Sequence, residues 1–152
     1  MIEISRTNSN NKHFKFLISL LDDELRGRYG ELQNFYDSYN SIEANVNVVV
    51  VYIDKSPAAC GCFKEYEPET VEIKRMFVQS NYRGKGISKI VLNELEKWAQ
   101  ESGFQKAVLE TGTKQIEAVG LYQKSGYKIM DNYGQYAGIE TSVCMRKELM
   151  IL

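Results

Sequence analysis

The sequence predicts one α/β domain over residues 1–152, in which a mixed, mostly antiparallel sheet carries helices on both faces. Two observations indicate this class. Segments rich in β-branched residues alternate with segments whose apolar residues recur every three or four positions, which are the patterns of strands and amphipathic helices. The chain has 152 residues, 43% of them hydrophobic, which is enough for one buried core and short for a second domain.

The first predicted elements are a short strand and a helical region. Apolar and polar residues alternate over residues 2–5, as in a strand. The polar stretch 8–11 is suited to capping a helix, and apolar residues then recur at helical spacing from Phe14 to Leu25. Gly27 and Gly30 interrupt this spacing, so we expect a bend between this helix and a second helix over residues 32–39.

Three strands are predicted in the middle of the chain. Residues 46–53 are rich in β-branched side chains, and the turn-forming residues 54–57 separate them from a further strand over 58–66. This arrangement predicts a hairpin. A second turn over 67–69 leads into a strand over 71–78.

Helices and strands alternate in the rest of the chain. The apolar spacing returns to the helical period after Gly86, and glycines stand where these helices are expected to end. The remaining predicted elements are a helix over 86–102, a buried strand over 107–109, a helix over 115–125, and strands over 127–130 and 142–146.

The charge composition disfavours partners that require a basic surface. Nineteen basic and 20 acidic residues give a net charge of −1, so nothing in the composition attracts nucleic acid or an anionic membrane. The longest apolar run, residues 48–53, is too short to span a bilayer. The N-terminus resembles a strand more than a targeting peptide, and three cysteines are an odd number for a disulfide framework. We therefore expect a cytoplasmic protein that binds neither nucleic acid nor membrane.

The cysteines do not predict a metal site. Cys60 and Cys62 are separated by one residue, which differs from the Cys-x-x-Cys spacing of zinc knuckles, and His13 lies far away in the sequence. We expect two small residues on one face of a strand, and no metal. Cys144 likewise has no histidine near it in the sequence that could activate it, so we expect a core residue rather than an acyl-cysteine nucleophile.

A glycine-rich segment follows the strand that is predicted to end at Val78. Gly84 and Gly86 stand where this strand turns into the next helix, and glycine allows the backbone to approach an anion closely. The free N–H groups of the first helical turn favour a phosphate, and Arg83 and Lys85 add positive charge. These features predict a local phosphate site.

The residues of this segment exclude two common nucleotide motifs. A Walker loop is absent, and Lys89 stands where a dinucleotide fingerprint requires its third glycine. From these residues alone, another phosphorylated ligand, or a glycine turn without a ligand, remains an alternative.

The motif Arg83-x-x-Gly86-x-Ser88 resembles the acyl-CoA motif of the GNAT superfamily, Gln/Arg-x-x-Gly-x-Gly/Ala, and differs only at Ser88. The order of predicted elements is also similar over nearly the whole chain. The resemblance implies the GNAT-like acyl-CoA N-acyltransferase fold, with acetyl-CoA as cosubstrate. It also implies a pyrophosphate held by backbone N–H groups and a pantetheine arm paired with a strand. The residues concerned are Arg83, Gly84, Lys85, Gly86, Ile87 and Ser88 for the pyrophosphate, and Phe77 and Val78 for the pantetheine arm.

A second segment, residues 118–127, resembles the superfamily pattern Asn-x-x-Ala-x-x-Leu-Tyr-x-Lys-x-Gly-Phe. The resemblance implies that Tyr122 is the general acid that protonates the departing sulfur. Gln115 takes the place of the leading Asn, which is a secondary cofactor contact in the superfamily. Without the resemblance, a tyrosine on a helix is typical of amphipathic packing.

Two carboxylates are candidates for the acceptor side. Glu72 lies six residues before Val78, where histone acetyltransferases of the superfamily carry a catalytic glutamate, so it is the candidate general base. The alternative is a solvated glutamate or a structural partner of Lys74 or Arg75. Glu110 ends the neighbouring predicted strand and is a second carboxylate for the acceptor cleft.

The resemblance implies an N-acetyltransferase that transfers the acetyl group directly to a primary amine of a small molecule or peptide. In the superfamily the acceptor contacts regions that correspond to residues 21–25, 29–39 and 131–136, which are acidic and aromatic here. Such residues suit a cationic amine, although they are equally typical of a solvated helix face. The alternatives are a non-catalytic acyl-CoA-binding regulatory domain and a module for another phosphorylated ligand. Edge strands near the C-terminus allow a homodimer by analogy.

Overall fold

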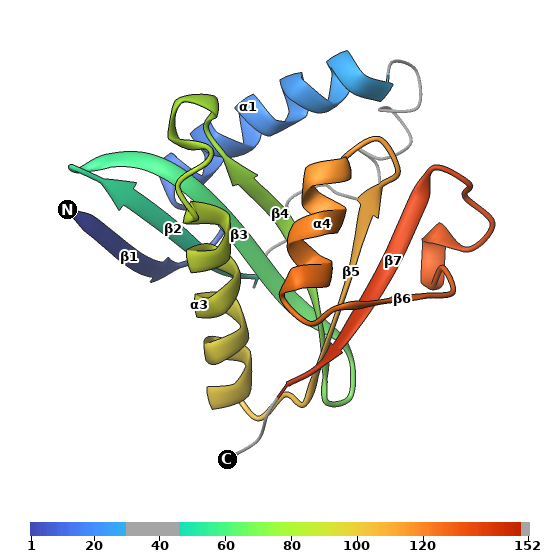
Figure 1. The fold of residues 1–152 in the computed structure, drawn as a ribbon. Helices are drawn as coiled ribbons and strands as arrows, with labels where there is room; N and C mark the ends of the chain where they lie inside the picture. Colours follow the sequence, from blue (N-terminus) through green and yellow to red (C-terminus); the bar gives the residue numbers. More distant parts are fainter. Residues whose placement is uncertain (30–45, 150–152) are drawn as a thin grey trace. The chain divides into compact units, whose positions relative to one another are not determined.

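The structure is a computed structural model that describes residues 1–29 and 46–149 (Figure 1). The predicted second helix, over residues 32–39, lies outside the described residues. The described elements, in chain order, are β1 (Ile2–Thr7), α1 (Lys12–Tyr29), β2 (Asn47–Ile53), β3 (Ser56–Glu67), β4 (Thr70–Val78), η1 (Ser80–Tyr82), α3 (Ile87–Glu101), β5 (Lys106–Gly112), α4 (Ile116–Lys124), β6 (Lys128–Met130), η2 (Gly134–Tyr136) and β7 (Ser142–Glu148).

The strands form one sheet in the order β1-β2-β3-β4-β5-β7-β6. Strand β2 pairs antiparallel with both β1 and β3, and β7 pairs antiparallel with both β5 and β6. Strands β4 and β5 are parallel, and α3 forms the crossover that a parallel pair requires. The prediction of a mixed, mostly antiparallel sheet is therefore confirmed.

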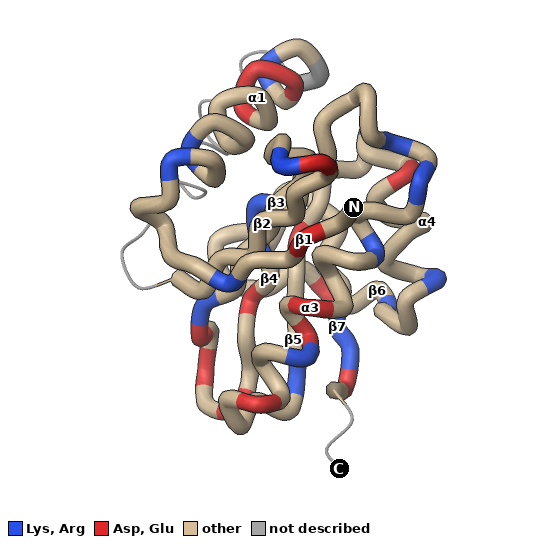
Figure 2. Tube along the Cα trace, turned by 90° about the vertical axis from the view of Figure 1, so that its left-hand side faces the viewer, with Lys and Arg blue, Asp and Glu red and all other residues tan. Residues whose placement is uncertain are grey.

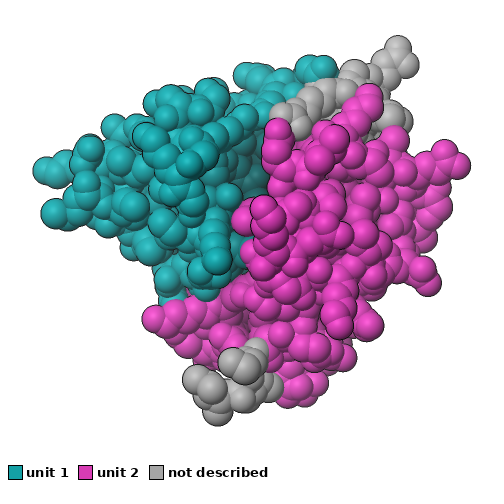
Figure 3. All heavy atoms as spheres, viewed as in Figure 1, with its two compact units in different colours: residues 1–64, 74–95 teal, residues 65–73, 96–152 magenta. Residues whose placement is uncertain are grey.

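The chain divides into two compact units, which are described separately below and are coloured separately in Figure 3. Unit 1 comprises residues 1–64 and 74–95, and unit 2 comprises residues 65–73 and 96–152. Unit 1 therefore holds α1, β1, β2, most of β3, the end of β4 and the start of α3. Unit 2 holds the start of β4 and the chain from the end of α3 onwards.

Alternation along β3 places the helices of unit 1 on opposite faces of its sheet. Cys60 and Cys62 belong to a buried cluster with the apolar residues of α1. Gly61 lies between them and faces the other way, toward Val91 and Leu95 of α3. The predicted placement of helices on both faces holds within this unit, and the two cysteines share one strand face as expected. The core residues of the α1 face include Phe14, Leu17, Ile18, Leu21, Val48, Val50 and Phe77.

Helix α1 is longer than the sequence pattern predicts. The side chain of Asn11 accepts hydrogen bonds from the backbone N–H groups of His13 and Phe14, at 2.9 and 3.0 Å, and so caps the helix start. The helix passes through Gly27 to Tyr29, so the interruption expected at Gly27 is wrong, whereas Gly30 lies outside the described residues. A single interior glycine costs a helix only about 1 kcal/mol, which the buried apolar face of α1 outweighs.

The hairpin between β2 and β3 has a tighter turn than predicted. Asp54 and Lys55 adopt φ values of 49° and 70°, which is the conformation of a two-residue turn. Strand β3 consequently begins at Ser56, inside the segment 54–57 that was predicted as the turn. Among the described residues, no helix is both long enough and apolar enough to cross a membrane.

Candidate functional site

The glycine-rich loop lies in unit 1 between the end of β4 and the start of α3. Gly84 and Gly86 adopt φ values of 80° and 76°, a conformation that strongly favours glycine. The carbonyl of Gly86 accepts the first helical hydrogen bond, from the N–H of Ile90 at 3.4 Å. The N–H groups that begin α3 at Ile87 therefore have no acceptor within the helix, and they carry the positive end of its dipole.

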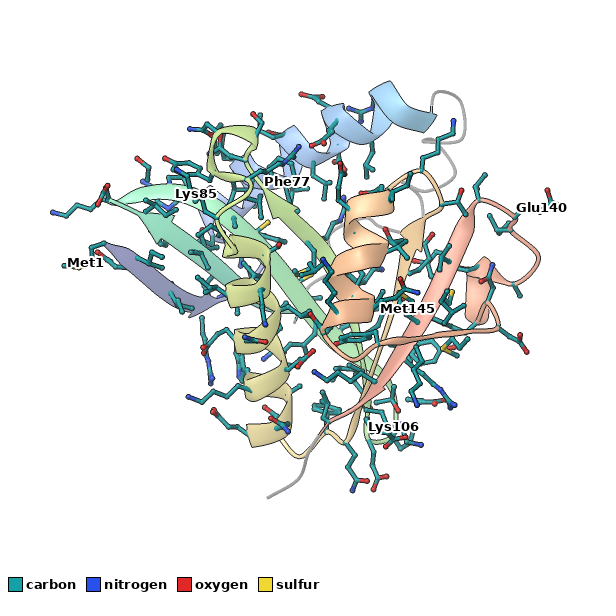
Figure 4. All side chains as sticks on the ribbon, in the orientation of Figure 1. Met1, Phe77, Lys85, Lys106, Glu140 and Met145 are labelled. Carbon is teal, nitrogen blue, oxygen red and sulfur yellow. The ribbon has the colours of Figure 1, made fainter. Side chains whose placement is uncertain are left out.

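Space at the two glycines fits an anion. A Cβ atom added at Gly84 or Gly86 would meet no atom within 4 Å, so the backbone of the loop is open on that side. Lys85 is exposed, and its Nζ lies 5.9 Å from the ring centroid of Tyr82. Figure 4 labels Lys85 in this loop and Phe77 near the end of β4. An open stretch of backbone at a helix N-terminus, with a lysine beside it, is suited to a pyrophosphate.

The Arg83 side chain is engaged within unit 1. Its two terminal nitrogens donate to the carboxylate oxygens of Glu24 on α1, at 3.1 and 2.7 Å, and its Nε donates to the carbonyl of Val78 at 2.8 Å. The guanidinium also lies over the Phe77 ring, 5.6 Å from its centroid. Arg83 therefore ties the loop to α1 and β4, which the sequence pattern alone did not predict.

The start of the loop is tied to β3. The backbone N–H of Gln79 donates to the carbonyl of Ala58 at 2.8 Å, and its side-chain Nε2 donates to the carbonyl of Pro57 at 2.6 Å. The Phe77 side chain is buried in the core on the α1 side. The end of β4 is thus held firmly while the glycines beyond it remain open.

Strand β4 is irregular at Arg75. This residue has φ 59°, which is rare for a non-glycine residue inside a strand and is typical of a bulge. The pairing of β4 with β5 runs from Thr70 to Ile73, before this point. The carbonyl of Arg75 accepts a hydrogen bond from the Cys60 thiol at 3.5 Å. Arg75 stands where the alternation of Val71 and Ile73 would place an apolar residue, so the sequence carries a local signal of this irregularity that was not used in the prediction.

Tyr122 lies on α4 in unit 2. Its side chain is 6% exposed and contacts the ring of Tyr127 edge to face, with centroids 5.7 Å apart. Burial, and to a lesser extent the charge of Glu110, raises the pKa of Tyr122 well above its ordinary value. The phenol therefore keeps its proton at neutral pH, so it can act as a hydrogen-bond donor to a developing negative charge. Gln115 precedes the first residue of this helix and is half-buried.

Glu72 lies in the part of β4 that belongs to unit 2, and it is 2% exposed. Its Oε2 accepts a hydrogen bond from the Tyr133 hydroxyl at 2.7 Å. The alternative of a solvated glutamate is therefore wrong. Arg75, one of the two partners that were weighed for Glu72, forms an ion pair with Asp22 at 2.7 Å.

Cys144 lies on β7 near this carboxylate and is fully buried, which confirms it as a core residue. Burial raises the pKa of its thiol to about 11. A thiol with this pKa carries almost no thiolate at neutral pH, and the thiolate is the nucleophilic form. The structure thus disfavours an acyl-cysteine mechanism.

The three acceptor regions differ in what the structure describes. Figure 2 shows an acidic stretch on α1. In this stretch Asp22 pairs with Arg75 and Glu24 pairs with Arg83. Residues 30–39 lie outside the described residues. The region 131–136 supplies Tyr133, whose contact with Glu72 the sequence did not predict.

The predicted site residues are divided between the units. The loop residues 83–88, with Phe77 and Val78, lie in unit 1, whereas Glu72, Gln115 and Tyr122 lie in unit 2. Among residues 1–29 and 46–149, no cluster of three metal-ligating side chains is present.

Comparisons with known proteins agree with these features. The model of the acetyltransferase (GNAT) family matches residues 14–127. A relative from Azospirillum brasilense named IAA acetyltransferase is 30% identical over 135 residues, which cover 88% of each chain. The fold is similar to a PaiA N-acetyltransferase from Thermoplasma acidophilum in complex with coenzyme A, with a TM-score of 0.73, 20% identity, and coverage of 97% of this chain and 99% of that one.

A second solved structure, a GNAT family acetyltransferase from Elizabethkingia anophelis with acetyl-CoA bound, has a TM-score of 0.71 at 20% identity. The likeness covers 97% of this chain and 98% of that one. The family match covers most of the chain and includes the glycine-rich loop and Tyr122. The chain therefore belongs to the GNAT family of acetyltransferases, and it is an acyltransferase with the acyl-CoA N-acyltransferase fold.

Proposed function

We propose that residues 1–152 act as one domain that transfers the acetyl group of acetyl-CoA directly to a primary amine of a small molecule or peptide. The observation that carries this proposal is the open, positive-φ backbone at Gly84 and Gly86, immediately before the N-terminus of α3. This geometry suits a pyrophosphate group. The acetyl-CoA in the Elizabethkingia structure gives it further support.

The roles proposed for unit 1 concern binding. The backbone N–H groups of residues 83–88 hold the pyrophosphate, and the exposed Lys85 adds charge from its side chain. Arg83 contributes its backbone, because its guanidinium is engaged by Glu24 and by the carbonyl of Val78. The backbone of Phe77 and Val78 pairs with the pantetheine arm, and N–H groups near Val78 polarise the thioester carbonyl.

The roles proposed for unit 2 concern proton movement. Bound acetyl-CoA supplies an activated acetyl group as a thioester. Tyr122 donates a hydrogen bond or a proton to the departing sulfur; its raised pKa favours the hydrogen-bond role, because a strongly held proton is transferred less completely. Glu72 takes the proton of the incoming amine, and Gln115 makes a secondary cofactor contact.

The proposed acceptor is a cationic amine. Tyrosine rings near the Glu72 carboxylate in unit 2 support this proposal. The near-neutral charge and three free, buried cysteines support a cytoplasmic location with neither nucleic acid nor membrane as partner. A homodimer through an edge strand is also proposed, on analogy alone.

The test combines titration calorimetry with a thiol-release assay. Acetyl-CoA is expected to bind, and coenzyme A release is expected to depend on one class of amine in a panel of polyamines, amino acid derivatives and peptide N-termini. Binding without release for every amine would instead support a non-catalytic acyl-CoA-binding domain. Binding of a nucleotide in place of acetyl-CoA would refute the proposal.

A further inference from the structure

A hydrogen bond joins two residues of unit 2 that lie 61 positions apart. The Tyr133 hydroxyl donates to Oε2 of Glu72 at 2.7 Å, a short distance typical of a bond to a charged acceptor. The carboxylate is almost fully buried, and burial penalises its ionised form. A hydrogen bond donated to the carboxylate offsets part of that penalty.

The Tyr133 ring is fixed on two sides. It contacts Tyr66 with ring centroids 5.0 Å apart at 64°, and Tyr136 with centroids 5.6 Å apart at 86°. Both are edge-to-face contacts, each worth about 0.5–1.5 kcal/mol beyond area burial. Tyr66 is partly exposed, whereas Tyr136 is fully buried, so the stack anchors Tyr133 to the core of unit 2. The hydroxyl is therefore held in one place relative to the carboxylate.

The direction of the hydrogen bond is also fixed. Burial, and then the charge of Glu72, raises the pKa of Tyr133 far above its ordinary value, so its oxygen keeps its proton and remains the donor. Three groups that feel the charge of Glu72 are Tyr66 from β3, Tyr136 from the same segment as Tyr133, and Cys144 from β7; the Glu110 carboxylate of β5 also acts on Tyr136 and Cys144. Burial and negative neighbours raise the pKa of all three, so none of them ionises near neutral pH.

We propose that Tyr133 is a positioning residue that holds the Glu72 carboxylate in one orientation by donating a hydrogen bond to it. This inference rests on the proposed acetyl transfer. In that step the amine loses a proton to Glu72, the nitrogen lone pair forms the C–N bond, and the C–S bond breaks with its electron pair going to sulfur. The sulfur then takes a proton from Tyr122. Glu72 and Tyr122 exchange protons with solvent afterwards.

The proposal makes a specific statement about pH dependence. The base must be ionised to act, so turnover rises with pH along an acid limb. Without the Tyr133 hydroxyl, the ionised carboxylate loses a stabilising donor, and the acid limb moves to higher pH. A hydrogen bond to a charged group contributes about 1.5 kcal/mol or more, which corresponds to a displacement of about one pH unit. If Tyr133 had a purely structural role, removing its hydroxyl would leave the acid limb of the pH profile unshifted.

The test uses Tyr133→Phe, which keeps the ring and removes only the hydroxyl. Steady-state kinetics with the best amine of the panel are measured across pH, at a temperature where circular dichroism shows every variant to be folded. We expect kcat to fall about tenfold, the KM for acetyl-CoA to stay within about twofold, and the acid limb to shift alkaline by about one unit. The matched control is Tyr66→Phe, whose hydroxyl makes no hydrogen bond to Glu72 in the structure. Its profile is expected to match the wild type.

The Glu72→Gln variant separates this inference from the proposed function. Adding Tyr133→Phe to Glu72→Gln should cause little further loss, because both changes act on one proton transfer. An active wild type with an unshifted limb in Tyr133→Phe overturns the inference alone. Full activity in Glu72→Gln overturns the inference together with the proposed role of Glu72 as base, and leaves acetyl transfer itself standing. A wild type that releases no coenzyme A with any amine overturns the proposed function as well.

Discussion

Gly61 of β3 lies where the sheet of unit 1 meets α3, and its replacement by alanine tests the packing of this face. Its φ is not positive, so alanine can adopt the same backbone conformation. An added Cβ would lie 2.6 Å from the Met76 Sδ and 2.9 Å from both Val91 Cγ1 and Leu95 Cδ1. The last two side chains are fully buried. We therefore expect Gly61→Ala to overpack this interface.

The magnitude follows from two opposing terms. Overpacking a core with one carbon atom costs about 1–3 kcal/mol of unfolding free energy. Replacing glycine by alanine also restricts the unfolded chain, which returns about 0.4–1 kcal/mol. The midpoints of these ranges leave a net loss of about 1.3 kcal/mol, and for a chain of this size it lowers the unfolding midpoint by about 3–5 °C.

The assay is thermal and denaturant unfolding, followed by circular dichroism. The matched control is Gly27→Ala on α1, where an added Cβ would meet no atom within 4 Å. This change should raise stability by about 0.5–1 kcal/mol, because alanine has the higher helix propensity. If Gly61→Ala were as stable as the wild type or more stable, while Gly27→Ala behaved as expected, the packing argument would be refuted.

Three further predictions concern unit 2 and the loop. Glu96→Ala should destabilise the protein by about 1–3 kcal/mol in denaturant unfolding. The buried Glu96 carboxylate accepts hydrogen bonds from Tyr127 at 2.9 Å and from Lys147 at 2.8 Å, and both donors would lose their acceptor. An unchanged unfolding midpoint would contradict this role. Gly86→Glu should abolish acetyl-CoA binding in calorimetry by placing a negative charge in the anion site, and binding that survives would show that the phosphate lies elsewhere. Tyr122→Phe should lower turnover by about 10²-fold with unchanged acetyl-CoA affinity, and unchanged turnover would remove its proposed role as proton donor.

Much of the fold could be predicted because it depends on local patterns. The strand over 46–53 was predicted from β-branched residues, and the helix after Gly86 was predicted from apolar spacing; both lie within one residue of the observed β2 and α3. The absence of the interruption that was expected at Gly27 has a clear cause. A glycine lowers helix propensity locally, but the long-range burial of Phe14 and Leu17 decides whether the helix persists.

Much of the candidate site could also be named, but its contacts could not. The local residue pattern predicted the glycine-rich loop around Gly86, and the family resemblance pointed to the segment around Tyr122. Arg83 was expected to add positive charge to the phosphate site, yet its guanidinium is engaged by Glu24, 59 residues earlier in the chain. Glu72 and Tyr133 are 61 positions apart in the chain, and no periodic pattern in the sequence predicts their contact.

The sequence by itself determined the fold class, the glycine-rich turn into α3 and the family, because each depends on residues that lie close together in the chain. Only the tertiary structure decided which charged and hydroxyl groups are paired. Strand pairing and sheet burial bring distant side chains together, and burial then sets their ionisation. For this reason Glu72 was a candidate base in the sequence, and became in the structure a buried carboxylate held by a tyrosine hydroxyl.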